Sequence, residues 1–198
     1  MRTFVHMTDL FPGDPRTNRE RMIAGDLYIA DDPELEAALG RAAALAHRYG
    51  ELHPTDPAAA RSVLEELLGS IAPDAHIRPP LYVDYGSHIT VGSGTFANYG
   101  LTALDVAPIT IGDDVQIGPY VQLLTPTHPL DPEQRRNKLE AASPIVIGDN
   151  VWLGGGAIVL AGVTIGADSV IGAGSVVTRD IPAGVVAVGT PARVVRPL

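Results

Sequence analysis

The sequence predicts a mainly β protein: a left-handed parallel β-helix of hexapeptide repeats, preceded by a small helical cap. Large aliphatic residues return every six positions in the C-terminal half, and a second inward series follows each of them four positions later. Aromatic residues make up only 5% of the chain, whereas Gly (21) and Pro (17) are abundant. A period of six matches neither an α-helix nor simple strand alternation and is typical of hexapeptide β-helices.

The repeat is uninterrupted near the C-terminus. Each hexapeptide supplies a short strand and a corner, the aliphatic residue fills the interior, and three hexapeptides close a triangular coil, so residues 18 apart stack. A Val/Ile/Gly-rich β-sandwich is the alternative, but it would match this period only by chance. The first inward series is Ile147, Leu153, Val159, Ile165, Ile171 and Val177. The second is Val151, Ala157, Val163, Ser169, Ser175 and Ile181.

Two segments interrupt the rhythm. Earlier copies of the repeat are out of phase by four residues, which predicts an irregularity within residues 93–108. Residues 124–144 carry no repeat, and long excursions from a compact fold are usually functional. The earlier copies are Ile71, Ile77, Val83 and Ile89, followed by Ile111, Ile117 and Leu123.

Helix signals are confined to the N-terminal third. A short helix is expected over residues 19–30. Asp32-Pro33 starts a second helix that should stop at Gly50, and Asp56-Pro57 starts a third that ends near Gly69. The expected organisation is an arm (1–18), a helical cap (19–70), a β-helix (71–192) with an inserted loop (124–144), and a C-terminal tail (193–198).

Composition excludes several classes of function. The net charge of −9 argues against nucleic-acid and anionic-membrane binding, which need a basic surface. The absence of Cys excludes disulfides and thiolate catalysis. No signal peptide and no run of about 18 apolar residues is visible, so no membrane association and a cytoplasmic location are expected.

Several segments resemble the hexapeptide-repeat acetyltransferases, in particular the maltose and galactoside O-acetyltransferases and the nodulation-factor acetyltransferase. The resemblance runs from about Arg21 to the C-terminus. It implies transfer of an acetyl group from acetyl-CoA to a sugar hydroxyl by a homotrimer with active sites between neighbouring subunits. The segments are MIAGDLY (22–28), FANYGLTALD (96–105), THPLDPEQRR (127–136), PIVIGDNVWLGGGAIVLAGVTIG (144–166) and VVAVGTPARVV (185–195).

His128 is the expected general base. It lies in the inserted loop between Pro126 and Pro129, which stiffen its backbone. An imidazole is suited to removing the proton of an alcohol near neutral pH, and the resemblance assigns this histidine the role of base. The resemblance also implies that Glu140 orients the imidazole. A solvated loop glutamate is the alternative.

For the acceptor, the resemblance points to Asn98, whose amide can both donate and accept hydrogen bonds. Asp84 and Asp105 are further expected substrate contacts, although Asp and Asn are also common at coil corners. At the cap position where galactoside enzymes carry an acceptor-binding Asp, this chain has Ala30. That difference bears on which acceptor is used.

For the donor, the resemblance points to the last coils. Trp152, the only tryptophan, should face outward and contact the pantetheine arm or base of CoA. Gly154 and Gly155 should let the thioester approach backbone N–H groups. No Lys or Arg occurs between Lys138 and Arg179, so Arg179, Arg193 and Arg196 are the only cations of the last coils and tail, where an anionic cofactor fits. The remaining candidates are Ala173, Thr178, Arg179, Arg193 and Arg196.

Three alternatives remain open. A non-sugar alcohol such as an antibiotic could be the acceptor, and a solenoid could bind a ligand without turnover. A metal-dependent hydratase resembling the γ-class carbonic anhydrases needs clustered histidines. His76 and His88 are 12 apart rather than 18 and belong to different faces, so no metal is expected.

Overall fold

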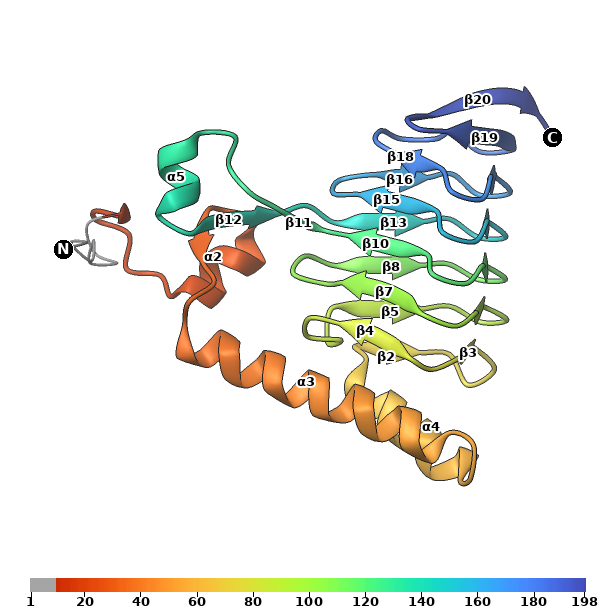
Figure 1. Ribbon diagram of the computed structural model, residues 1–198, viewed down its shortest axis with the longest axis horizontal. Helices are drawn as coiled ribbons and strands as arrows, with labels where there is room; N and C mark the ends of the chain where they lie inside the picture. Colours follow the sequence, from red (N-terminus) through yellow and green to blue (C-terminus); the bar gives the residue numbers. More distant parts are fainter. Residues whose placement is uncertain (1–9) are drawn as a thin grey trace.

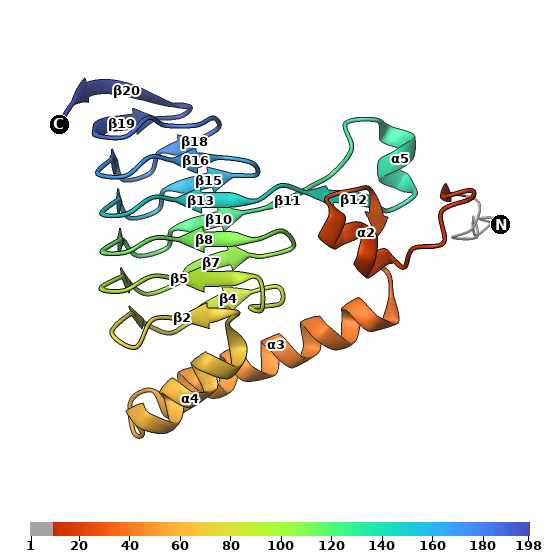
Figure 2. The same ribbon diagram turned by 180° about the vertical axis from the view of Figure 1, so that it is seen from behind.

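The computed structural model describes residues 10–198. It is a left-handed parallel β-helix whose three sheets form the faces of a triangular prism. Figures 1 and 2 show the coils stacked in sequence order, with the helical cap at the N-terminal end and an inserted segment projecting from one side. The predicted fold class is confirmed.

The three faces are named here in chain order. Face 1 consists of β2 (Ser70–Ile71), β5 (Ile89–Val91), β8 (Ile109–Ile111), β13 (Ile145–Ile147) and β16 (Thr164–Ile165). Face 2 consists of β3 (His76–Ile77), β6 (Phe96–Ala97), β9 (Gln116–Ile117), β14 (Trp152–Leu153), β17 (Val170–Ile171), β19 (Val185–Gly189) and β20 (Ala192–Pro197). Face 3 consists of β4 (Leu81–Val83), β7 (Leu101–Leu104), β10 (Gln122–Leu124), β15 (Ile158–Leu160) and β18 (Val176–Val177).

Both inward series of the last coils point into the prism. All their side chains are buried, which confirms the predicted periodicity. Two of them are serines, and both are hydrogen-bonded to backbone: Ser169 Oγ donates to the Pro182 carbonyl (2.8 Å), and Ser175 Oγ accepts from Gly189 N (3.0 Å). A narrow interior thus tolerates a polar group whose hydrogen bonds are satisfied.

The phase shift has a simple origin. Ile71 pairs with Val91 and Val91 with Ile111, so the first two coils are 20 residues long, whereas Ile147 pairs with Ile165, 18 residues on. Two extra residues in each of two coils produce the four-residue shift. They lie at the corners between faces 3 and 1, residues 84–88 and 104–108. The prediction of one irregularity within 93–108 was therefore half right, and Val91, rather than Ile89, stacks on Ile71.

The inserted loop leaves the prism at the same corner, one coil later. It connects β10 to β13 and contains β11 (Pro126–Thr127), α5 (Pro132–Arg136) and β12 (Leu139–Ala142). Residues 84–88, 104–108 and 125–144 therefore stack along one edge of the prism, called here the long-corner edge.

The cap contains α2 (Asn18–Ala24), β1 (Tyr28–Ile29), α3 (Pro33–Leu52) and α4 (Pro57–Leu67). Asp32 and Asp56 cap α3 and α4 through backbone N–H groups, as their sequence predicts. The first helix is shorter than expected because Gly25 ends it in the left-handed conformation (φ 78°). The expected stop at Gly50 was wrong: α3 continues to Leu52, and Gly50 packs within it against Pro79.

The cap contacts the prism at two places. Side chains of α3 and α4, including Tyr49 and Leu64, join the main core beneath the first coil. Separately, β1 pairs antiparallel with β12, so cap and inserted loop share the small sheet β1-β12-β11. A second small core lies beside this sheet; it comprises Met22, Tyr28, Leu35, Tyr85, Val106, Ala107 and Ala142.

The two chain ends differ from the expected arm and tail. Of the arm expected over 1–18, residues 1–9 lie outside the described residues, and residues from 10 onward contact α2 through Asp14 and Arg21 (2.7 Å). The expected tail forms β20, which pairs antiparallel with β19 and covers the last coil. Within residues 10–198, no helix has the length and apolar character needed to cross a bilayer.

Candidate active site

The expected site residues divide between two edges of the prism. On the long-corner edge lie His128, Glu140, Asp84 and Asp105, with Thr178 and Arg179 at the corresponding corner of a later coil. On the edge between faces 2 and 3, called here the glycine edge (residues 78–80, 98–100, 118–121, 154–157 and 172–175), lie Asn98, Gly154, Gly155 and Ala173. Within one chain, these two groups are separated by face 3.

His128 directly follows β11, and Glu140 lies on the neighbouring strand β12. Nδ1 of His128 is 3.9 Å from Oε1 of Glu140, within ion-pair range but longer than a hydrogen bond. The His128 side chain is 58% exposed and the Glu140 side chain 24%. The carboxylate thus faces one ring nitrogen, while Nε2 bonds to no group within residues 10–198.

Tyr28 is a site neighbour that the sequence analysis did not single out. Its hydroxyl donates to Oε2 of Glu140 (2.9 Å), and the residue is only 1% exposed. Burial, reinforced by the charge of Glu140, holds the pKa of Tyr28 well above its usual range. The MIAGDLY segment marks the cap, but no local pattern links its tyrosine to a residue 112 positions away.

Asp105 is fully buried and builds the corner beneath the site. Its carboxylate accepts from three backbone N–H groups, those of Asp84 (3.1 Å), Tyr85 (2.8 Å) and His88 (3.1 Å). Its carbonyl oxygen lies 2.7 Å from Nδ1 of His88. The carboxylate points into the protein, and its hydrogen bonds fix the backbone of the preceding corner, residues 84–88.

Asp84 is half-buried on the same corner. Burial, followed by the negative charges of Asp105 and Glu140, raises the pKa of Asp84 to about 6. Its carboxyl group therefore changes charge close to neutral pH and can accept a hydrogen bond from a hydroxyl group when ionised.

Asn98 occupies the corner that follows β6. Its Oδ1 accepts from the backbone N–H of Tyr99 (2.9 Å), which leaves the Nδ2 donors without a partner within residues 10–198. The Arg78 guanidinium lies over the neighbouring Tyr99 ring, 4.9 Å from its centroid. The amide is thus oriented by its own backbone, with its donor end available.

The glycines of this edge have distinct roles. Gly154 donates its N–H to the Ile171 carbonyl (2.8 Å), and a Cβ there would come within 2.5 Å of Ala173 N. Gly154 is therefore required for coil stacking, and its N–H is not available to a thioester, contrary to expectation. The N–H groups of Gly155 and Ala173, by contrast, donate to no group within residues 10–198.

The remaining donor-site candidates are on the surface. Trp152 is 56% exposed on face 2, as its position before an inward leucine predicts. Arg193 and Arg196 lie on β20, where each contacts a nearby backbone carbonyl and neither forms an ion pair with a described residue. Thr178 and Arg179 are exposed after β18.

Comparison with known proteins identifies the class. Residues 21–72 match the maltose acetyltransferase hexapeptide capping motif, and residues 144–179 match the bacterial transferase hexapeptide (six repeats). Nodulation protein L of Rhizobium meliloti (strain 1021) is 49% identical over 179 residues, 90% of this chain and 98% of that protein.

Solved structures agree with this match. A maltose O-acetyltransferase from Clostridium difficile 630 superimposes with a TM-score of 0.91 at 40% identity, over 93% of this chain and 99% of that one. A galactoside acetyltransferase in complex with coenzyme A gives a TM-score of 0.88 at 40% identity, over 92% and 91%. The fold and both comparisons define an acyltransferase. The chain belongs to the hexapeptide-repeat acetyltransferases, in the group of the maltose and galactoside O-acetyltransferases.

Proposed function

We propose that this enzyme transfers an acetyl group from acetyl-CoA directly to a hydroxyl group of a sugar or glycoside, with His128 as general base. The observation that carries the proposal is the His128–Glu140 pair. The exposed imidazole lies on a loop stiffened by prolines, with a carboxylate 3.9 Å from Nδ1 and no group of residues 10–198 bonded to Nε2. This is the base-and-orienter arrangement of catalytic triads, with the substrate hydroxyl as the nucleophile.

The reaction follows from that geometry. The acceptor oxygen attacks the thioester carbonyl carbon while Nε2 of His128 takes the hydroxyl proton. The tetrahedral oxyanion then collapses, the carbon–sulfur bond breaks, and the imidazolium returns its proton to the departing CoA thiolate. Glu140 keeps the ring oriented and stabilises its transient positive charge. No cysteine is present to form an acyl-enzyme, which fits a single displacement.

The glycine edge and the last coils fit the donor. The N–H groups of Gly155 and Ala173, which have no acceptor in the described part of the chain, can bind an amide or thioester oxygen, and Trp152 offers an exposed apolar ring to the cofactor. Arg193 and Arg196 carry charge suited to CoA phosphates, and Arg179 is a third cation on the last coils. A galactoside acetyltransferase of the same fold binds coenzyme A.

For the acceptor, we assign Asp84 and Asn98 to hydroxyl groups, with Asp105 holding the corner below Asp84. The names of the maltose and galactoside enzymes support a sugar. Ala30 lies in the cap, half-buried against the small core. Its methyl group cannot bind a hydroxyl, so acceptor contacts on this side depend on neighbouring polar groups.

The two separate edges support a homotrimer. Face 3 lies between the long-corner and glycine edges. A ring that joins the long-corner edge of one chain to the glycine edge of the next turns all three copies of face 3 toward the symmetry axis and makes three equivalent sites. Of the outward-facing apolar residues of the last coils, Ile158 and Val176 lie on face 3 and suit this interface, whereas Trp152 and Val170 lie on face 2.

His128→Ala tests the function. Acetylation of a panel of sugars and glycosides, followed as CoA release, should fall by roughly 10²–10⁴ in kcat, the usual contribution of a positioned general base. Binding of acetyl-CoA should persist. The matched control is His47→Ala, which removes an exposed histidine from α3 and should leave kcat unchanged. High turnover of His128→Ala, with or without weakened acetyl-CoA binding, would overturn the assignment.

A further inference from the structure

We propose that Tyr28 is a positioning residue for catalysis and that the segment formed by residues 10–32 serves to hold it. In this arrangement Tyr28 fixes Glu140, and Glu140 in turn orients His128. The inference rests on the proposed function, because it assigns a cap residue to the same proton transfer.

The strand register brings the two residues together. Tyr28 on β1 is the direct antiparallel partner of Glu140 on β12. Its hydroxyl donates to Oε2 of Glu140 at 2.9 Å, while the other oxygen, Oε1, faces Nδ1 of His128 at 3.9 Å. Each carboxylate oxygen therefore has its own neighbour. A carboxylate held at one oxygen cannot rotate freely, so the direction of the second oxygen is defined.

The tyrosine itself is fixed by packing. Its ring belongs to the small core with Met22, Leu35, Tyr85 and Ala142, and only 1% of its surface is exposed. Burial and the charge of Glu140 hold the pKa of Tyr28 well above its usual range, so the hydroxyl keeps its proton at any pH at which the enzyme would work. A rigid, permanently protonated donor is suited to orienting a carboxylate.

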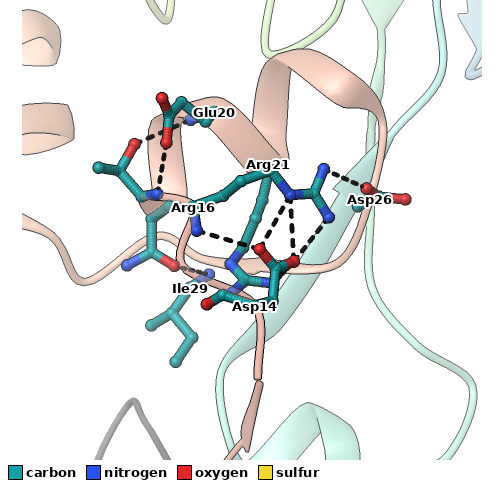
Figure 3. A network of polar contacts seen from close by, with 8 residues as sticks. Asp14, Arg16, Glu20, Arg21, Asp26 and Ile29 are labelled. Carbon is teal, nitrogen blue, oxygen red and sulfur yellow. Dashed lines mark hydrogen bonds and ion pairs between the residues drawn. The ribbon is translucent and has the colours of Figure 1, made fainter. Parts of the chain in front are cut away.

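The segment that precedes β1 is tied down by a charged network (Figure 3). Asp14 accepts from Arg16 and Arg21, both at 2.7 Å, and Arg16 also pairs with Asp26 at 2.7 Å. Arg21 is nearly buried, with its guanidinium 3.8 Å from the centroid of the Phe11 ring. These contacts fold the chain back over α2 instead of leaving it extended.

Asn18, which lies on α2 with Arg21, attaches this helix to β1. Its Oδ1 accepts from the backbone N–H of Ile29 (3.1 Å), and its Nδ2 donates to Asp32 (3.1 Å), the residue that caps α3. Asn18 thereby attaches the Ile29 end of β1 and the start of α3 to α2. A strand of two residues, paired on one side only, has little stability of its own, so these attachments are what keep Tyr28 in register.

A double-mutant cycle tests the proposal. Tyr28→Phe removes only the hydroxyl and should lower kcat about tenfold, the effect of losing one hydrogen bond to a charged group, with the KM for acetyl-CoA unchanged. Because Tyr28 acts through Glu140, Tyr28→Phe in a Glu140→Gln background should cost almost nothing further. The matched control is Tyr49→Phe, another buried tyrosine, whose hydroxyl donates to the Ile77 carbonyl. Its effect should simply multiply with that of Glu140→Gln.

Each outcome has one meaning. A wild-type kcat for Tyr28→Phe, or effects of Tyr28→Phe and Glu140→Gln that multiply, would overturn the inference. If Tyr28→Phe fails to fold, Asp14→Asn takes its place, since Asp14 lies outside the small core. The effects of Asp14→Asn and Glu140→Gln on kcat should then be non-additive. Effects that multiply would contradict the inference. If His128→Ala is inactive but the effects of Tyr28→Phe and Glu140→Gln on kcat multiply, this inference is rejected and the proposed function stands. Full activity of His128→Ala rejects the proposed function itself.

Discussion

Two aspartates on the long-corner edge show how position decides what a residue does. Asp105 and Asp84 lie at equivalent corners of successive coils, yet one is fully buried and bonded to three N–H groups, and the other is half-buried and faces two further carboxylates. Asp105 stabilises the corner, whereas ionisation of Asp84 is disfavoured by burial and by the neighbouring negative charges. Sequence reasoning treats both as acceptor contacts, because residue type alone does not report which way a carboxylate points.

Asp84→Asn should therefore increase stability in a pH-dependent way. The pKa of this carboxyl group is 3.8 in the unfolded chain and is raised to about 6 in the folded protein. The free energy of unfolding therefore falls as the pH rises from about 4 to about 6, because the carboxyl group ionises more easily in the unfolded chain. After discounting for solvent exposure, the variant should gain about 1–2 kcal/mol in free energy of unfolding at pH 8 and almost nothing at pH 4.

Urea unfolding at several pH values measures this difference. The control is Asp74→Asn, whose exposed carboxylate has its pKa lowered by the Ser93 hydroxyl. Its stabilising effect is present above pH 4 and is lost on acidification, so the control should gain nothing at pH 8. An equal gain for Asp84→Asn at pH 4 and pH 8 would contradict the assignment.

At the scale of elements, three enlarged corners carry the proposed acid–base residues and the carboxylates beside them. Residues 84–88, 104–108 and 125–144 leave the regular coil at the same edge, and the small core that contains Tyr28 of β1 packs beside them. Regular coils need only glycine or a left-handed residue at a corner, as at Asn150 (φ 55°) and Asp168 (φ 60°). The longer corners need additional hydrogen bonds, and Asp105 supplies them.

Asp105→Ala should destabilise the protein by about 3–5 kcal/mol, because it leaves buried N–H groups of the preceding corner without an acceptor. Asp113→Ala is the matched control. That carboxylate also accepts a backbone N–H one coil earlier, from Ser93 (2.7 Å), but it is exposed, so water can replace it at a cost of about 1 kcal/mol or less. Chemical denaturation of both variants compares them, and similar losses would show that Asp105 is no more than an ordinary corner residue.

At the scale of the whole molecule, the proposed site residues of one chain lie on two separate edges of the prism. His128 and Glu140 project from the long-corner edge, and Asn98 lies on the glycine edge with the N–H groups of Gly155 and Ala173, which donate to no group within residues 10–198. Face 3 separates them, so in the proposed function a complete site forms with the edge of a second chain. This is the structural basis of the proposed trimer.

Subunit mixing tests that arrangement. His128→Ala and Asn98→Ala chains should each be nearly inactive alone. Each mixed trimer should recover activity at one of its three interfaces, the one where an intact long-corner edge meets an intact glycine edge, which is about a quarter of all interfaces in an equal mixture. If both residues served a site within one chain, mixing would restore nothing. Light scattering at assay concentration completes the test, and a fully active monomer would rule the trimer out.

Much of this protein follows from its sequence because the relevant interactions are local and periodic. The six-residue period fixes which side chains enter the prism, and Asp-Pro pairs fix where α3 and α4 begin. His128 and Glu140 were identified through a motif, and their proximity is visible in the structure. The exact corner lengths could not be derived from the sequence, because aliphatic residues such as Ile89 and Val91 could each occupy the inward position that stacks on Ile71.

Only the tertiary structure decided the long-range arrangement. The pairing of β1 with β12 and the Tyr28–Glu140 hydrogen bond join residues 112 positions apart. No periodic pattern in the sequence predicts such a contact. The same holds for Asp105, whose partners lie 17 to 21 residues earlier. The sequence by itself determined the coil, because each repeat buries its own aliphatic residue. The folded chain determined the site, because two-residue insertions at a corner set which distant groups meet there.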